Sequence, residues 1–444
     1  MNRFRQRRRF LRQSLAAAAS FASGCLAGGA PAAESRSPGE RLNLAIIGTG
    51  NKGWDNIKQL AGQNFVALCD VDARFLSKAA AHYPAARQYR DYRRLLDAEQ
   101  NQIDAVVIST ADHTHAPATS AALDLGKHVY CEKPLTHTVA EARAIANLAR
   151  RKRVATQMGT QIHADDNYRR AAEWIQSGAI GEVREVYHWH NSGRPGGGYQ
   201  PWDGPSPAHV DWDLWLGPAK QRTYSPGVHP NGWRYYWEYG GGTFADIACH
   251  VMDLSFWALG LKHPTSVECE GPPVDPISTP RWVKAMYDFP AAGQRPAVRL
   301  YWSHGGAHFD TVTATRDHAG KPLSSWGKGV LFVGDKGMLA ADYTRRQLLP
   351  KEKFADFQPP PPTIANSLGH WNEWVTACKT GSPTLCNFDY AGALTETVLL
   401  GLAAYRTGQR LEWDFANLKA TNTRGAEQYL TKEYRKGFEV VGVS

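Results

Sequence analysis

Residues 44–53 read Leu44-Ala45-Ile46-Ile47-Gly48-Thr49-Gly50-Asn51-Lys52-Gly53, four apolar residues followed by a Gly-x-Gly-x-x-Gly turn. Residues 54–60 continue with a helical pattern, so the turn joins a short buried strand to a helix. A second apolar run at 65–69 ends in Asp70, 22 residues beyond Gly48. This arrangement is typical of a dinucleotide-binding site, although a glycine turn without a ligand is the alternative.

Each residue type in such a site has a physical task. Gly48 permits the tight turn, Gly50 lets the backbone approach a pyrophosphate, and Gly53 lets the helix pack on the strand. The helix N-terminus faces the phosphate charge. The Asp70 carboxylate would accept hydrogen bonds from ribose hydroxyls and repel a 2′-phosphate, which favours NAD over NADP.

The pattern of strand followed by helix repeats along the N-terminal half. Apolar strand-like runs occur at 105–109, 128–131 and 154–156, and helical stretches at 79–81, 117–125 and 138–150. Short, fully apolar strands alternating with helices predict a doubly wound parallel sheet.

Length and charge limit the remaining possibilities. A chain of 444 residues is expected to form two or more domains. The net charge of +9 falls to +3 without the six arginines of residues 1–33, so nucleic-acid binding is not expected. No apolar stretch long enough to span a membrane follows the N-terminal segment.

Residues 1–33 have the features of an export signal. Arg7-Arg8-Arg9-Phe10-Leu11 precedes an apolar, small-residue run at 15–27, which resembles a bacterial twin-arginine signal with cleavage after Ala32 or Ala33. We therefore expect export to the periplasm. An ordinary Sec signal is the alternative, and lipidation at Cys25 is a less favoured one.

Six cysteines follow the signal without CxxC or zinc-site spacing, and no metal ion is expected. They are interpreted as buried thiols, although an oxidising compartment would permit a disulfide.

Three further motifs follow in order: Ser109-Thr110-Ala111-Asp112-His113-Thr114-His115, Glu132-Lys133-Pro134, and Gly240-Gly241-Gly242-Thr243-Phe244-Ala245-Asp246-Ile247-Ala248-Cys249-His250. Together they resemble the Gfo/Idh/MocA family of sugar oxidoreductases, whose members usually have proline where Ala111 stands. The similarity runs from about residue 43 to about residue 408.

This resemblance implies an α/β plus α+β fold. We expect an NAD-binding Rossmann domain at 41–158 and a substrate and oligomerisation domain at 159–444, built on a large, open, mostly antiparallel sheet. Runs at 183–189, 266–269, 283–289, 298–302 and 330–333 are strand-like. Helices within 369–408 are expected to pack back toward the Rossmann domain, after a proline linker at 359–362. A homodimer or homotetramer is expected through the C-terminal sheet.

The glycine motif and the resemblance together give the expected cofactor-binding residues. They are Gly48, Gly50, Asn51, Lys52, Gly53, Asp70, Thr110, His113, His115, Glu132, Lys133 and Gln161.

Three residues can supply the chemistry of sugar oxidation, and the resemblance implies that they are catalytic. Asp246 and His250 are four residues apart, so they share one face of a helix expected at 244–259, which Asp253 and Trp257 continue. His250 would act as general base with a pKa near the working pH. Lys133 would stabilise the developing alkoxide. A metal site at the histidine and carboxylates is the alternative.

The segment 191–242 is long for a connection and rich in glycine, proline and aromatic residues, which predicts a functional loop. Its aromatic side chains are expected to divide between a small core of their own and contacts with sugar rings. The expected substrate-binding residues are Trp202, Trp233, Arg234, Tyr235, Tyr236 and His250.

The sequence therefore predicts an exported NAD-dependent oxidoreductase that acts on a sugar or sugar derivative. Because no free NAD pool exists outside the cytoplasm, the cofactor should be tightly bound and returned to its starting state in each cycle. The alternative is an NAD-dependent glycoside hydrolase that works through a transient 3-keto sugar. A non-catalytic sugar- and NAD-binding protein is the second alternative.

Overall fold

The computed structural model describes residues 40–196, 200 and 202–443. The export signal predicted at residues 1–33 and Cys25 lie outside the described residues. The described residues group as one compact unit. No helix among the described residues combines the length and the apolar character needed to cross a membrane.

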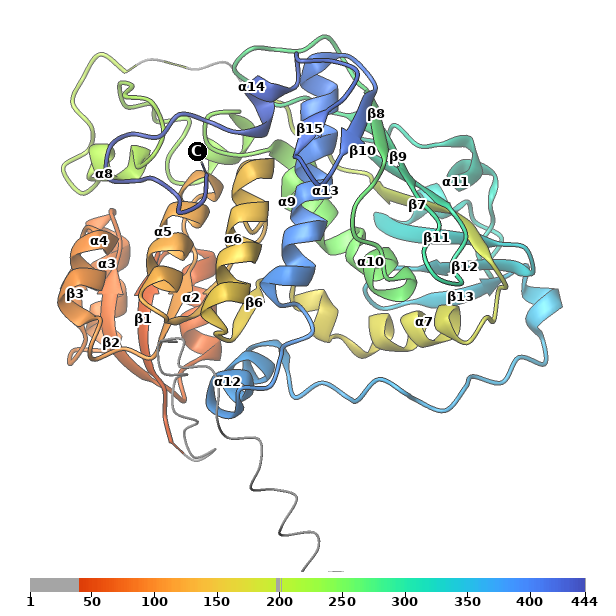
Figure 1. Ribbon diagram of the computed structural model, residues 1–444, viewed down its shortest axis with the longest axis horizontal. Helices are drawn as coiled ribbons and strands as arrows, with labels where there is room; N and C mark the ends of the chain where they lie inside the picture. Colours follow the sequence, from red (N-terminus) through yellow and green to blue (C-terminus); the bar gives the residue numbers. More distant parts are fainter. Residues whose placement is uncertain (1–39, 197–199, 201, 444) are drawn as a thin grey trace, which may run out of the picture. The chain divides into compact units, whose positions relative to one another are not determined.

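A six-stranded parallel sheet forms the N-terminal half, with strand order β3-β2-β1-β4-β5-β6 (Figure 1). This is a doubly wound sheet, as the alternation of apolar strands and helices predicts. Its elements are β1 (Asn43–Ile47), α2 (Lys52–Gln59), β2 (Asn64–Cys69), α3 (Ala73–His82), β3 (Arg87–Tyr89), α4 (Tyr92–Glu99), β4 (Ala105–Ile108), α5 (Asp112–Asp124), β5 (His128–Cys131), α6 (Val139–Lys152) and β6 (Thr156–Met158).

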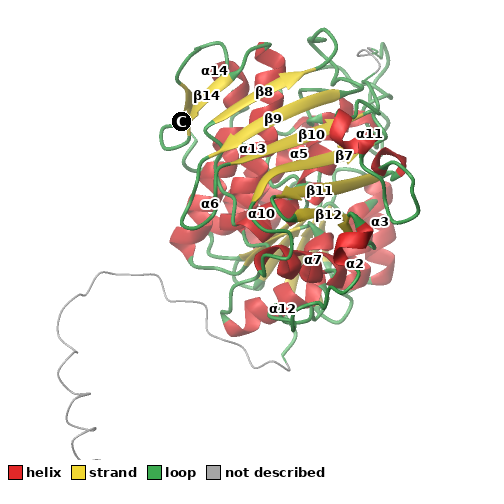
Figure 2. Ribbon diagram, turned by 90° about the vertical axis from the view of Figure 1, so that its right-hand side faces the viewer, coloured by secondary structure: helices red, strands yellow, loops and turns green. Residues whose placement is uncertain are grey.

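A nine-stranded sheet forms the C-terminal half, in the order β13-β12-β11-β7-β10-β9-β8-β14-β15 (Figure 2). Only β7 and β10 run parallel, so the sheet is mostly antiparallel as expected. Its strands are β7 (Val183–His190), β8 (Ser266–Glu270), β9 (Val283–Phe289), β10 (Val298–His304), β11 (Lys328–Gly334), β12 (Gly337–Ala341), β13 (Arg346–Leu349), β14 (Leu411–Asp414) and β15 (Lys419–Ala420).

Helices and short turns accompany this second sheet. They are η1 (Gln161–Ala164), α7 (Asp166–Gln176), α8 (Trp212–Leu216), η2 (Gly232–Tyr235), α9 (Gly242–Val251), α10 (Asp253–Leu259), α11 (Asp310–Ala314), η3 (Leu323–Ser325), η4 (Lys351–Phe354), α12 (His370–Thr380), α13 (Phe388–Thr407) and α14 (Glu427–Leu430). The single helix expected at 244–259 is in fact two, α9 and α10, which meet at Met252.

One hydrophobic core connects the two sheets. Helix α13 packs against α6 of the first sheet and against α9 and β8 of the second. Ile145 of α6, Leu394 of α13 and Phe244 of α9 are buried in the same apolar cluster. The connection between α12 and α13 also pairs with β6, because Met158 N donates to Cys386 O at 3.0 Å, and Phe388 N at the start of α13 donates to Thr156 Oγ1 at 3.0 Å. Helix α13 thus contacts both α6 and β6 of the first half of the chain.

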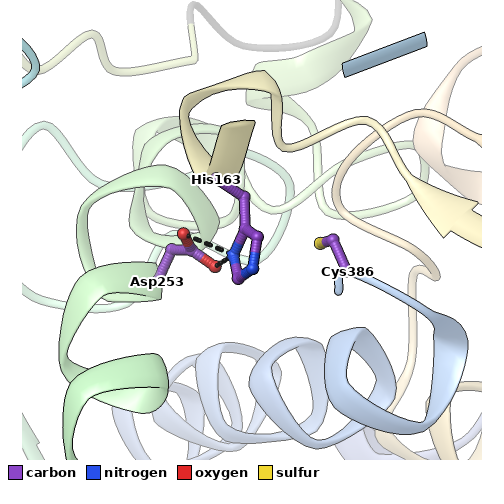
Figure 3. Close-up of side chains that lie close together, drawn as sticks. All are labelled: His163, Asp253 and Cys386. Carbon is purple, nitrogen blue, oxygen red and sulfur yellow. Dashed lines mark hydrogen bonds and ion pairs between the residues drawn. The ribbon is translucent and has the colours of Figure 1, made fainter. Parts of the chain in front are cut away.

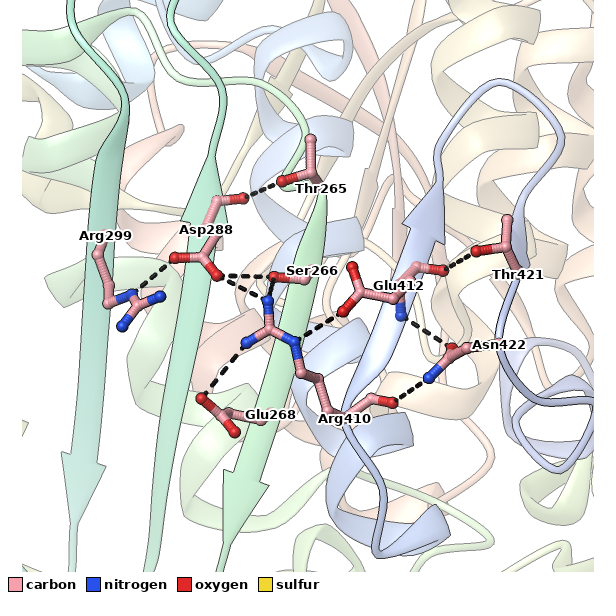
Figure 4. A network of polar contacts seen from close by, with 9 residues as sticks. All are labelled: Thr265, Ser266, Glu268, Asp288, Arg299, Arg410, Glu412, Thr421 and Asn422. Carbon is pink, nitrogen blue, oxygen red and sulfur yellow. Dashed lines mark hydrogen bonds and ion pairs between the residues drawn. The ribbon is translucent and has the colours of Figure 1, made fainter.

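The outer face of the nine-stranded sheet carries charges near one edge (Figure 4). Alternating burial along β9 explains this, because Tyr287 faces the core and Asp288 faces outward. Arg410, just before β14, donates to Asp288 at 2.9 Å and to Glu412 at 2.8 Å, and Arg299 of β10 donates to Asp288 at 2.6 Å. This network fastens β14 to the central strands.

Candidate functional site

A cleft of about 650 Å³ brings together residues from both halves of the chain. Most residues predicted for the site line it: Gly48, Gly50, Asn51, Lys52, Asp70, Thr110, His113, His115, Glu132, Lys133, Gln161, Trp233, Arg234, Tyr235, Asp246 and His250. The strand ends of the parallel sheet form one wall, and the segment 191–242 together with α9 forms the other. The cleft therefore follows the rule that open α/β sheets bind ligands at the carboxyl ends of their strands.

The glycine turn between β1 and α2 has the geometry that a dinucleotide requires. Gly48 has φ +87°, and an added Cβ would lie 2.6 Å from Ser109 O. A Cβ at Gly53 would lie 2.0 Å from Gly48 O, so Gly53 packs the helix against the turn and does not line the cleft. At Gly50 the close neighbour is the ring of Phe75, 2.4 Å from a Cβ. No described side chain caps α2, and although Gly53 N donates to Gly50 O at 2.8 Å, the helix N-terminus still faces a phosphate with its positive end.

Asp70 lies at the end of β2 and holds this turn. One of its oxygens accepts hydrogen bonds from Thr49 N at 2.8 Å, Thr49 Oγ1 at 3.1 Å and Gly50 N at 3.2 Å. Burial raises the pKa of Asp70 despite these donors. The residues present fit an adenine dinucleotide, with a glycine cradle, a free helix N-terminus and an acid at the ribose position.

His113 and His115, the two histidines predicted to bind the cofactor, contact backbone carbonyl oxygens of neighbouring segments with their ring nitrogens. His115 contacts Pro134 O at 2.7 Å and Thr110 O at 3.1 Å with its two ring nitrogens. His113 Nε2 contacts Trp215 O at 3.0 Å, which joins the first sheet to the segment 191–242. Burial lowers the pKa of His113 to about 3, so its ring is neutral.

Lys133 follows β5 and meets Asp246 of α9 across the cleft. Lys133 Nζ donates to Asp246 O at 2.8 Å and also pairs with the Asp246 carboxylate. Arg234 Nε lies 3.0 Å from the same carboxylate. Burial tends to raise the pKa of Asp246, but Lys133 and Arg234 together hold it below its usual value. Asp246 is therefore a charged carboxylate between two cations.

Glu132 fixes the residue before Lys133. Its Oε1 accepts hydrogen bonds from Asn56 Nδ2 at 2.9 Å, from Tyr130 OH at 3.3 Å and from Gln161 Nε2 at 3.3 Å. These contacts hold the end of β5 against α2 and η1, and so set the position of Lys133.

His250 is half-buried one helical turn beyond Asp246. Its Nδ1 has no hydrogen-bond partner in the described part of the chain. Burial, with Lys133 as the next contribution, lowers the pKa of His250 well below its usual value. The expectation of a pKa near the working pH is therefore wrong. The imidazole is therefore neutral at neutral pH and is a weaker base than an ordinary histidine.

Asp112, the first residue of α5, lines the cleft and was not among the predicted site residues. It is 1% exposed, and neither carboxylate oxygen accepts a hydrogen bond from a described residue. Burial raises its pKa to about 7. Asp112 belongs to the motif at 109–115, which could have marked it as a site residue. The motif does not show, however, that its side chain is buried.

Two predicted substrate residues lie outside the cleft. Trp202 is 48% exposed and donates to Pro205 O at 3.1 Å. Tyr236 is buried in the apolar core of the segment 191–242, with Trp212 and Trp215, whose rings stack at 4.6 Å. The loop therefore has its own core, and only Trp233, Arg234 and Tyr235 of the predicted substrate residues in this loop reach the cleft.

Asp253 does not continue the face of Asp246 and His250, because the chain bends at Met252. It is fully buried and contacts His163 Nδ1 at 2.9 Å and Tyr390 OH at 2.8 Å. Figure 3 shows Asp253 and Cys386 approaching the His163 ring from different sides. These three groups are of the metal-ligating type, with ligand atoms within 4.8 Å of one another. Because a carboxylate only accepts, His163 Nδ1 carries the proton of its hydrogen bond.

Comparisons with known proteins agree with this architecture. Residues 42–160 match the oxidoreductase family described as an NAD-binding Rossmann fold, and residues 188–294 match its C-terminal alpha/beta domain. Inositol 2-dehydrogenase of Salmonella typhimurium (strain LT2) is 32% identical over 156 residues, which cover 34% of this chain and 46% of that protein. Inositol 2-dehydrogenase 2 of Saccharopolyspora erythraea is 34% identical over 161 residues, covering 35% and 47%. The matched region thus spans less than half of these relatives.

Solved structures share the fold at low sequence identity. The WlbA dehydrogenase from Bordetella pertussis, in complex with NADH and UDP-GlcNAcA, has a TM-score of 0.59 at 15% identity, covering 85% of this chain and 100% of that one. The aldose-aldose oxidoreductase from Caulobacter crescentus, complexed with glycerol, has a TM-score of 0.54 at 18% identity, covering 84% and 100%. The two family matches together cover more than half of the 444 residues, so the chain belongs to the Gfo/Idh/MocA family of oxidoreductases.

Proposed function

We propose that this protein oxidises a hydroxyl group of a sugar or sugar derivative with NAD bound in the cleft. One observation carries the proposal: Lys133, at a strand end of the parallel sheet, pairs with Asp246 beside His250, in the cleft that the glycine turn lines. NAD, when bound, supplies the acceptor for a hydride from the substrate carbon. The inositol dehydrogenases among the relatives support an alcohol substrate of this class.

The proposed roles of the side chains follow from their charges. His250 is neutral, so it takes the proton of the substrate hydroxyl. Lys133 donates a hydrogen bond to the oxygen as it becomes an alkoxide. Asp246 is the positioning residue that holds the Lys133 ammonium group. Trp233, Arg234 and Tyr235, which line the cleft, bind the sugar.

The choice and retention of the cofactor are part of the proposal. The second oxygen of Asp70, Oδ1, accepts one hydrogen bond, from Asp72 N at 2.9 Å, and so keeps a lone pair for a ribose hydroxyl. The carboxylate would repel a 2′-phosphate, which supports NAD over NADP. The twin-arginine pattern at residues 7–11 supports export of a folded, NAD-loaded protein. In the periplasm the bound NAD would be restored within each cycle, for example by reduction of a second sugar.

The first experiment is to purify the exported protein, denature it and assay the supernatant for NAD and NADP. We expect close to one NAD per chain and no NADP. A screen of free sugars and aryl glycosides, read by keto-sugar formation and by aglycone release, then identifies the reaction. Bound NAD without turnover of any sugar would favour the non-catalytic binding protein, whereas absence of both nucleotides would contradict tight binding.

A specific observation keeps the glycoside hydrolase as a second candidate. A reaction through a 3-keto sugar needs a group that removes the proton next to the ketone, in addition to the base for oxidation. Asp112 is a second unpartnered proton-transfer group in the same cleft, with a pKa of about 7. Aglycone release with incorporation of solvent deuterium at C2 would identify this reaction, and aglycone retention would exclude it.

The assembly is also a proposal. The open face of the nine-stranded sheet is suited to pair with a second copy, which would give a dimer or tetramer. Light scattering of the purified protein measures this directly, and a monomer would contradict it.

A further inference from the structure

The segment of residues 431–443 lies over the parallel sheet although it follows the last helix of the C-terminal half. In Figure 1 it runs from α14 back across the helices of the first sheet. The chain thus returns, at the end of the described residues, to the half in which it began. We call this segment the strap.

Polar contacts fasten the strap along its whole length. Lys432 Nζ donates to His113 O at 3.1 Å and pairs with Glu141 at 3.0 Å. Tyr434 OH donates to Glu141 at 2.9 Å. Further along, Val441 N donates to Ser120 Oγ at 2.9 Å. The strap therefore holds α5 and α6 at several points.

The middle of the strap is joined to both walls of the cleft. Arg435 donates to the Asp213 carboxylate at 2.6 Å, on the side of the segment 191–242. On the other side, Arg93 of α4 donates to Gly437 O at 3.3 Å. Opening the cleft would break contacts on one of these sides.

Phe438 is the strap residue that lines the cleft. Its side chain is 4% exposed, with the guanidinium carbon of Arg93 4.1 Å from the ring centroid and the Tyr92 ring 6.3 Å away. Arg435 of the strap itself lies farther off, with its guanidinium carbon 5.8 Å from the ring centroid, so α4 supplies the nearer of these cationic neighbours. An aromatic face in a fixed position can stack on a base.

The position of Phe438 identifies the part of a dinucleotide that it would meet. In a doubly wound sheet the acid after β2 binds the adenosine ribose, and the nicotinamide lies toward the strands on the other side of β1. Lys133 follows β5 on that other side, whereas Arg90, Asp91 and Tyr92 follow β3 and line the cleft together with Phe438. Phe438 therefore lies at the adenosine end.

We propose that the strap is part of the cofactor site, in which Phe438 covers the adenine base and slows release of the dinucleotide. This inference rests on the proposed function, because it concerns the NAD that the cleft would retain. Retention of the dinucleotide would thus depend on a segment that lies far from the glycine motif in the sequence.

The test measures release of NADH, independently of any sugar. The purified protein is loaded with NADH, freed of excess, and mixed with a large excess of NAD while energy transfer from tryptophan to NADH is followed. Replacing Phe438 by Ala should raise the release rate roughly 10–100-fold, the range expected from loss of one stacked base. Phe438→Leu keeps most of the apolar volume but lacks the aromatic face, and should also release NADH faster, by about tenfold.

Val440→Ala is the matched control. Val440 is a strap residue that is 3% exposed and does not line the cleft, so its replacement loosens the strap without removing a base contact. Release within about twofold of the wild type in Phe438→Leu, or equal acceleration in Val440→Ala, would overturn the assignment of Phe438. Fast release of NADH from the wild-type protein would contradict tight retention of the cofactor. The ratio of each variant's release rate to that of the wild type would still decide whether Phe438 of the strap slows release.

Discussion

Replacing Lys133 by methionine removes the ammonium group from the cleft and keeps most of the side-chain volume. The wild-type Nζ donates to Asp246 O at 2.8 Å and pairs with the carboxylate, with the two side chains only 14% and 23% exposed. In the variant, Arg234 alone would remain beside Asp246, at 3.0 Å. A hydrogen bond to a charged group contributes about 1.5–3 kcal/mol, so the alkoxide would lose stabilisation equal to a turnover decrease of roughly 10–150-fold.

The pH profile gives a second, independent readout of the same change. In the wild type the depressed pKa of His250 keeps the imidazole neutral, so activity is lost only as the pH falls through that depressed value and the base becomes protonated. Burial lowers the pKa of His250 most, and the charge of Lys133 is the next influence that lowers it. Without Lys133 the pKa of His250 therefore rises, and the loss of activity on the acid side should begin at a higher pH.

The assay is the rate at which bound NADH forms in a single turnover with the sugar found in the screen, at a series of pH values. Rates are divided by the NAD content of each preparation. Lys127→Met is the matched control, because Lys127 precedes β5, donates to Ile103 O at 3.0 Å and does not line the cleft. Turnover of Lys133→Met within about threefold of the wild type, with an unchanged acid limb, would refute the reasoning.

Three further changes test the remaining parts of the site. His250→Ala should lower turnover roughly 10²–10⁴-fold and leave the NAD content unchanged, since it removes the proposed base; near-native turnover, or activity lost to a chelator and restored by zinc, would contradict this role. Asp70→Ala should weaken NAD binding by about 1.5–3 kcal/mol and relax discrimination against NADP, as measured by titration; wild-type protein that binds NADP as tightly as NAD would contradict the assignment. Replacing Arg7, Arg8 and Arg9 together by Lys should leave the protein in the cytoplasm, as cell fractionation shows; continued export would indicate the Sec route.

The fold class could be predicted because the strands of the first sheet are short, apolar and separated by helices. Strand β3 was not predicted, because its sequence Arg87-Gln88-Tyr89 is polar. It forms a strand because β2 offers an edge to pair with. Similarly, β12 is recognised only as a partner of β11, and β13 only as a partner of β12. Pairing between distant segments is not visible in local sequence periodicity.

The residues of the candidate site also differ in how well the sequence predicts them, depending on whether they lie in a regular element. Residues at strand ends and on α9 could be identified because a regular element fixes the direction of each side chain. Trp202 and Tyr236 could not, because in an irregular segment the direction depends on which aromatic residues fill the local core. Asp253 was misplaced because a break of one residue at Met252 turns the following helix.

The apolar cluster shared by α6, α13 and α9 affects how this protein unfolds and how its two halves can be recombined with those of a relative. Neither sheet retains a complete hydrophobic surface when the other is removed, so thermal unfolding should be a single cooperative transition rather than two. For the same reason, an exchange of the NAD-binding half with that of a relative would place foreign side chains against α13. A working chimera would need the α6–α13 contact carried over as one piece, and the natural crossover points lie on either side of that helix pair.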